Sequence, residues 1–122
     1  MASLLNWFEI PVADFDRAQR FYEALLGHGV ERMALGALTM GMLSSDPAVA
    51  GGAIVHDPQN TPSVTGTVVY LNAGEDLAPM LARGEAAGGR VLVPKTEIGN
   101  GFGYFAHLLD TEGNRVGLHS MG

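Results

Sequence analysis

The sequence predicts an α+β fold built from two βαβββ modules in tandem. The first half shows a strand pattern, a helical pattern and three short strand patterns, and the same order returns in the second half. A segment rich in Pro, Asn, Asp and Ser, with the sequence HDPQNTPS, separates the halves. The 17 glycines have no regular period, which suits the turns between many short strands. We therefore expect a single domain over residues 1–122, with modules at about 1–60 and 61–122.

The first module begins with an alternating strand over residues 4–12. Asp14 then precedes a helical pattern that starts at Phe15 and stops at Gly27, so these residues suit an N-cap and a C-terminal cap. Three short apolar runs punctuated by Gly, Ser, Asp and Pro complete the module, and we expect strands over 30–36, 37–44 and 50–56.

The second module repeats this order from an apolar strand over residues 65–72. A helix is expected over 75–87, with Pro79 in its first turns and two glycines at its end. Strands are then expected over 90–94, 101–110 and 115–120, with Asp, Gly and Asn forming the last turn.

Composition excludes several classes of function. The formal net charge is −6 and no basic cluster occurs, so a nucleic-acid partner is not expected. The chain has no cysteine, which excludes disulfides, a thiolate zinc site and a cysteine nucleophile. The sequence shows neither a leader pattern nor a membrane-spanning apolar run, so we expect a cytoplasmic protein with no membrane partner.

Two stretches, NWFEIPVADFDRAQRFYEALLG and GYFAHLLDTEGNRVGLHS, resemble the vicinal oxygen chelate superfamily. This superfamily includes glyoxalase I, bleomycin-resistance proteins and extradiol dioxygenases, and the resemblance covers about Leu4 to Ser120. It implies that curved sheets from the two modules form a cup, which is often completed by dimerisation. We therefore expect a small-molecule ligand and a homodimer.

The resemblance also implies where metal ligands would lie, on the first and last strands of each module. The corresponding residues here are Trp7, Ile54, Thr67 and Gly117, and none of these types is a usual ligand. Glyoxalase and dioxygenase chemistry depends on a divalent metal. The sequence therefore favours a protein without a metal cofactor, and a divalent metal is disfavoured.

Strand alternation then indicates which other side chains share the cup. If Trp7 faces inward so does Glu9, and if Gly117 faces inward so does His119. If Ile54 faces inward, His56 follows. Glu9, His56 and His119 are thus candidate catalytic residues, acting as acid and base or as a displaced metal site, although strand-end histidines without a chemical role fit equally well.

The candidate ligand-binding residues are Trp7, Thr67, Tyr104 and Arg115. Trp7 offers a flat apolar wall, and Arg115 is a candidate partner for the carboxylate of Glu9. Pairing of Leu108 with Gly117 would turn Tyr104 into the cup and would place His107 on the helix side.

The sequence supports two main hypotheses of function and does not decide whether the chain is an enzyme. The first is a metal-free binding protein of the glyoxalase/bleomycin-resistance type. The alternative is a glyoxalase-like lyase or related enzyme that acts on a small oxygenated metabolite through Glu9, His56 and His119. A third reading is a partner-binding or vestigial module with a filled cup.

Overall fold

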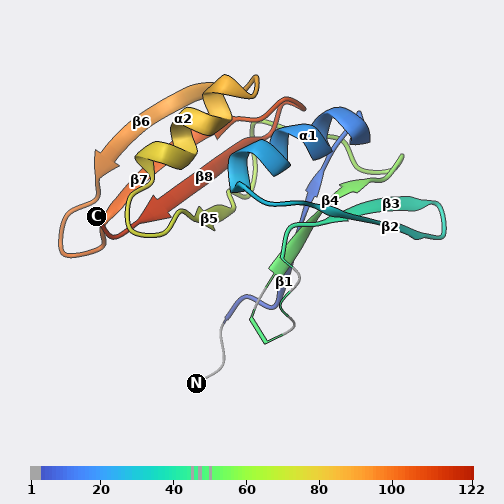
Figure 1. Ribbon diagram of the computed structural model, residues 1–122, viewed down its shortest axis with the longest axis horizontal. Helices are drawn as coiled ribbons and strands as arrows, with labels where there is room; N and C mark the ends of the chain where they lie inside the picture. Colours follow the sequence, from blue (N-terminus) through green and yellow to red (C-terminus); the bar gives the residue numbers. More distant parts are fainter. Residues whose placement is uncertain (1–3, 45, 47, 50) are drawn as a thin grey trace.

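The computed structural model describes residues 4–44, 46, 48–49 and 51–122, and it confirms two tandem βαβββ modules (Figure 1). The first module contains β1 (Trp7–Pro11), α1 (Phe15–Leu26), β2 (Glu31–Leu35), β3 (Leu38–Met42) and β4 (Gly51–His56). The second contains β5 (Tyr70–Asn72), α2 (Ala78–Ala86), β6 (Arg90–Glu97), β7 (Tyr104–Leu109) and β8 (Arg115–Ser120). Ala50, the first residue of the predicted fourth strand, lies outside the described residues.

Each module forms its own four-stranded sheet with the same topology. The strand orders are β1-β4-β3-β2 and β5-β8-β7-β6. In both sheets the first strand of the module pairs in parallel with its last strand, and the other neighbours are antiparallel. The sheets are therefore two copies of one arrangement, as the internal repeat predicts.

One hydrophobic core joins the two modules. The helices lie side by side across the sheets (Figure 1), and buried residues from both modules pack between helices and strands, among them Val12, Leu25, Leu77, Leu108 and Leu118. The opposite faces of the two sheets carry no helix, which leaves them open as a curved surface. No helix within the described ranges is long and apolar enough to cross a membrane.

Helix α1 begins and ends where the sequence predicts. The Asp14 side chain accepts a hydrogen bond from the backbone N–H of Arg17, and Gly27 ends the helix with a φ of 79°. Five apolar side chains at helical spacing are buried on one face: Phe15, Ala18, Phe21, Tyr22 and Leu25.

Helix α2 starts at Ala78 rather than at residue 75, because Pro79 occupies its first turn and has no N–H to extend the helix backwards. The Asp76 side chain instead accepts from the N–H of Ala78. Gly84 permits a close approach of this helix, since a Cβ there would overlap Leu108 and Leu25.

Strand β5 is much shorter than the predicted strand over 65–72. Gly66 has a φ of 98°, which is incompatible with a regular strand, and the hydroxyl groups of Ser63 and Thr65 form a local hydrogen bond. Regular pairing therefore begins only at Tyr70.

The turn between β7 and β8 ties the second module to the start of α1. The Glu112 carboxylate accepts from the N–H groups of Ala13 and Asp14 and forms an ion pair with Arg17 at 2.6 Å. The Asn114 side chain donates to the carbonyl of Pro11. These bonds fix the relative position of the two sheets.

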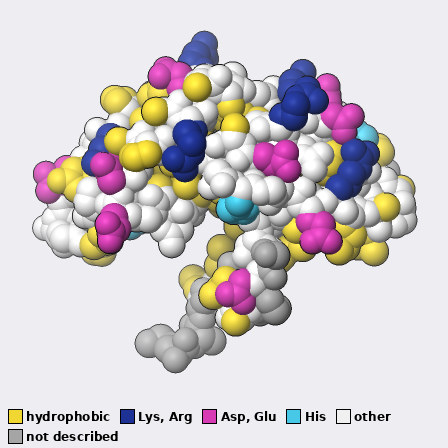
Figure 2. All heavy atoms as spheres, viewed as in Figure 1, with side chains coloured by type: hydrophobic (Ala, Val, Ile, Leu, Met, Phe, Trp, Pro, Cys, Tyr) yellow, Lys and Arg dark blue, Asp and Glu magenta, His cyan; other side chains and the backbone are white. Residues whose placement is uncertain are grey.

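Charged side chains on the face seen in Figure 2 are scattered, with Lys and Arg interspersed among Asp and Glu.

Candidate functional site

The open face of the second sheet carries aromatic and basic side chains. Ala106, Leu108, Val116 and Leu118 are buried in the helix-side core, so alternate residues of β7 and β8 project to the opposite face. The aromatic and basic side chains that β5, β7 and β8 place on this open face are Tyr70, Phe105, His107, Arg115 and His119.

A cavity of about 410 Å³ lies on this face and is lined by Tyr70, Ile98, Phe105 and His119. Its volume falls in the range typical of small-molecule sites. Two apolar side chains form walls, while a phenol and an imidazole supply polar atoms. The arrangement suits a small, largely apolar molecule with few polar groups.

The ring of Tyr70 covers Gly117, its partner on the neighbouring parallel strand. A Cβ added at Gly117 would overlap this ring, so no side chain can project from position 117 into the cup without displacing it. In the first module Trp7 likewise pairs with Gly51, but a Cβ there would lie 3.5 Å from the indole, which is an ordinary contact distance. The metal-ligand position that the resemblance implies at 117 is therefore closed by an aromatic ring, and these residues do not fit a metal.

A chain of hydrogen bonds runs from this ring, on the edge strand β5, to side chains on β7 and β8. The Tyr70 hydroxyl and His107 Nε2 are 2.7 Å apart, and the guanidinium of Arg115 lies 2.9 Å from His107 Nδ1. Arg115 also donates to the carbonyl of Val64 over 3.3 Å. Burial and the adjacent Arg115 charge both lower the pKa of His107, so its imidazole is neutral at pH 7.

His119 anchors the loop at the rim of the cavity. Its Nε2 lies 2.7 Å from the carbonyl oxygen of Phe102, which can only accept, so Nε2 carries a proton. Gly99, Asn100, Gly101 and Gly103 all have positive φ values, and this conformation turns the chain back between β6 and β7.

The three predicted catalytic residues line three different cavities. His119 belongs to the cavity of the second sheet, His56 to a hollow beside the N-terminus of α1, and Glu9 to a pocket of about 60 Å³ between the modules. Within the part of the chain that the structure describes, no three His, Asp or Glu side chains are grouped to hold a metal. The predicted convergence of this trio does not occur within one chain.

The prediction that His56 faces into the cup is wrong, because the residue lies on the helix side of its sheet. Glu9 pairs with Ala53, so Ala53 and Val55 share the open face, whereas Ile54 is buried in the helix-side core and His56 follows it. The predicted match of Ile54 with Gly117 therefore has the wrong parity, and a register error of an odd number of residues reverses every side chain of a strand.

The same error affects β7. Leu108 pairs with Val116 and His107 pairs with Gly117, so His107 lies on the open face. Tyr104 faces the helix side, where it packs against the core and contacts the ammonium of Lys95 at 4.7 Å. Tyr104 is therefore not in the cup, while His107 and Tyr70 are site residues that the sequence reasoning missed.

The other predicted residues lie around the module boundary. The three ion pairs among the described residues do not include Glu9 with Arg115, which corrects that pairing. Glu9 is exposed and accepts a long hydrogen bond of 3.4 Å from the Trp7 indole, so water solvates the carboxylate without a cationic partner. Thr67 and Arg115 line the same small pocket as Glu9.

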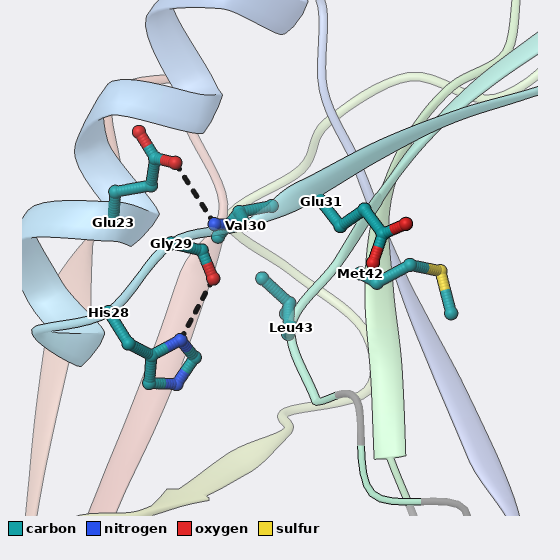
Figure 3. A pocket seen from close by; sticks show the side chains of 7 residues that line it. All are labelled: Glu23, His28, Gly29, Val30, Glu31, Met42 and Leu43. Carbon is teal, nitrogen blue, oxygen red and sulfur yellow. Dashed lines mark hydrogen bonds between the residues drawn. The ribbon is translucent and has the colours of Figure 1, made fainter.

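A further pocket of about 280 Å³ lies at the C-terminal end of α1 (Figure 3). Its polar groups are engaged in local structure, since Glu23 accepts from the N–H of Val30 and His28 Nδ1 donates to the carbonyl of Gly29. These bonds shape the connection to β2 and leave the second sheet as the better candidate site.

Comparison with known proteins agrees with this architecture. The sequence profile of the Glyoxalase/Bleomycin resistance protein/Dioxygenase superfamily matches residues 4–118. No curated protein matches the sequence.

Three solved structures illustrate the likeness in fold. A glyoxalase/bleomycin resistance protein from Albidiferax ferrireducens is 21% identical with a TM-score of 0.76, covering 98% of this chain and 100% of its own. Glyoxalase I from Zea mays is 16% identical with a TM-score of 0.74, covering 95% of this chain but only 44% of its own. TnmS3, an antibiotic binding protein from a Streptomyces species, is 23% identical with a TM-score of 0.65, covering 99% of this chain and 98% of its own.

Proposed function

We propose that this chain, which belongs to the Glyoxalase/Bleomycin resistance protein/Dioxygenase superfamily, binds a small and largely apolar molecule in the second-sheet cavity without a metal. The observation that carries the proposal is the Tyr70 ring over Gly117. It fills the place of a metal-ligand side chain and at the same time forms a wall of the cavity. A binding role is supported by the similar fold of TnmS3, which is described as an antibiotic binding protein.

A fragment titration tests this proposal. Chelator-dialysed, ¹⁵N-labelled protein is titrated with 2-acetylnaphthalene, a flat apolar probe with one polar oxygen, and backbone amide shifts are followed. We expect saturable shifts at Ile98, Phe105 and His119. The variant Ile98→Trp fills the cavity and should abolish them, whereas Leu4→Trp adds the same ring at a fully exposed position and should leave them unchanged. Shifts confined to residues elsewhere would contradict the proposal.

The proposal includes a homodimer, supported by the open face of the first sheet. Met40, Ala53 and Val55 form a small apolar cluster there, and more exposed apolar side chains flank it, namely Trp7, Met33 and Leu35. Apolar surface of this kind is typical of interfaces. Light scattering after size-exclusion chromatography should give a molar mass of two chains. Met33→Lys should reduce the measured mass to that of a single chain.

The alternative function, a glyoxalase-like enzyme, is favoured by one observation. His119 lines the same cavity as Tyr70, so an acid-base side chain would lie beside a probe bound there. In D₂O an enzyme of this type would exchange the methyl protons of 2-acetylnaphthalene, and His119→Gln would abolish the exchange. Binding without exchange supports the binding protein.

A further inference from the structure

We infer that Arg115 and His107 hold the Tyr70 hydroxyl as a hydrogen-bond donor toward the cavity, so that the ligand carries an acceptor oxygen of the carbonyl type. This inference deepens the proposed function and rests on it for the location of the ligand. The assignment of protons, however, follows from the described hydrogen bonds alone.

Arg115 fixes the role of one His107 nitrogen. A guanidinium stays protonated in proteins and has only donors, so its contact of 2.9 Å with His107 Nδ1 requires a lone pair on that nitrogen. The bond from Arg115 to the carbonyl of Val64 holds the guanidinium in place. His107 Nδ1 is therefore the acceptor.

The other ring nitrogen of His107 is a donor. A neutral imidazole with an unprotonated Nδ1 carries its proton on Nε2. A cationic ring would direct an N–H against the guanidinium, so the neutral tautomer is the one that this geometry accepts. The Nε2–H group then donates to the Tyr70 oxygen over 2.7 Å.

The hydroxyl of Tyr70 accepts one hydrogen bond and has one proton left to donate. Because its oxygen accepts from His107, its own O–H proton must point away from the imidazole. The ring is held over Gly117 and lines the cavity together with Ile98 and Phe105. Since His107 occupies one side of the hydroxyl, we infer that the O–H group turns toward the cavity, beside these two apolar walls.

This donor determines the class of ligand. A molecule that places only hydrocarbon against Tyr70 leaves the O–H group without a partner when water is displaced, which costs binding free energy. An ammonium group cannot accept and is further disfavoured by the Arg115 charge. A ketone, quinone or amide oxygen satisfies the hydroxyl, so we expect a flat apolar ligand with such an oxygen.

The proton assignment is tested without any ligand. Long-range ¹H–¹⁵N spectra distinguish protonated from unprotonated imidazole nitrogens, and wild type should show His107 with a bare Nδ1 and a protonated Nε2. Arg115→Lys keeps a donor-only cation and should keep this tautomer. Arg115→Met removes the constraint and should produce a mixture, while Arg20→Met, an exposed arginine on α1, should change nothing. A protonated Nδ1 in wild type overturns the inference.

The ligand class is tested with two probes of similar shape, 2-acetylnaphthalene and 2-ethylnaphthalene. We expect the ketone to bind wild type roughly three- to tenfold more tightly, the effect of one net hydrogen bond. Tyr70→Phe keeps the ring over Gly117 and should remove this preference without weakening the hydrocarbon probe. Arg115 does not line the cavity, yet Arg115→Met should also reduce the preference for the ketone. Arg115→Lys should retain that preference.

The outcomes separate the two proposals. Equal binding of both probes to wild type overturns the inference and leaves the proposed function standing. If neither probe binds, the proposed function fails, while the imidazole spectra still decide which nitrogen of His107 carries the proton. A ketone preference that persists in Tyr70→Phe also overturns the inference.

Discussion

The hydroxyl of Tyr22 in α1 donates a hydrogen bond of 2.7 Å to the carboxylate of Asp110 at the end of β7. The two residues are 0% and 4% exposed, and the bond joins the helix of one module to the last hairpin of the other. Asp110 also accepts from the Asn114 side chain and from the backbone of the turn. The bond therefore links the core to the turn that orients the two sheets.

Removal of this bond should destabilise the protein. Tyr22→Phe leaves a buried acceptor with one partner fewer, and we expect a loss of about 1–2 kcal/mol in the free energy of unfolding. Tyr104→Phe makes the same chemical change at a half-buried residue and should cost little. Urea denaturation measures both, and equal losses would contradict the assignment.

A side chain at position 117 should conflict with Tyr70. Gly117→Ala forces a Cβ into the Tyr70 ring, and overpacking of this kind costs about 1–3 kcal/mol. In Tyr70→Ala the same glycine substitution should cost much less, because the ring is gone. A double-mutant cycle by urea denaturation measures this coupling, and additive losses would show that the ring does not close the position.

The Glu112 carboxylate should make stability depend on pH. Burial raises its pKa, but hydrogen bonds from Arg17, from the backbone of Asp14 and Ala13 and from Thr111 outweigh burial, so the pKa lies below its usual 4.5. A lowered folded-state pKa stabilises the protein above the unfolded value, and this contribution is lost as pH falls through the folded value.

Unfolding free energies measured from pH 7 to pH 3 should therefore fall more steeply in wild type than in Glu112→Gln. Glu85→Gln, at an exposed carboxylate on α2, is the matched control and should keep the wild-type slope. The same slope in Glu112→Gln would contradict the role given to this carboxylate.

His107 should titrate below the usual histidine value of 6.5, because burial and the Arg115 charge lower its pKa. The unfolded chain binds this proton more readily than the folded one, so stability should decrease as pH falls from 6.5 toward the folded pKa. Arg115→Met removes the neighbouring charge and should raise the NMR titration midpoint of His107. An unchanged midpoint would show that Arg115 does not act on the imidazole.

The sequence predicts the fold well because its local signals agree with each other. Asp14 and Gly27 bound α1 correctly, and the alternation around Ile10 correctly assigns both faces of β1. The faces of β4 and β7 are not predicted correctly, because both strands are apolar on both sides. Alternation then gives no parity, and a shift of one residue moves His56 and His107 to the wrong faces.

Tyr70 escapes the sequence reasoning for a related reason. It lies at the end of the apolar run TGTVVYLN, in which nothing distinguishes a core aromatic from a site aromatic. Its role depends on pairing with Gly117, a relationship across 47 residues that only the strand register reveals. Once the register is known, an aromatic residue opposite a glycine recurs in both modules, as Trp7 with Gly51 and Tyr70 with Gly117.

The central claim is that the second-sheet cavity binds its ligand without a metal. Isothermal titration of 2-acetylnaphthalene into chelator-dialysed protein, repeated after addition of Zn²⁺, Ni²⁺, Mn²⁺ or Fe²⁺, tests it most directly. We predict the same dissociation constant in all five titrations, and its loss in Ile98→Trp. Binding that requires one of the metals, with that metal retained near one equivalent per chain, would contradict the account.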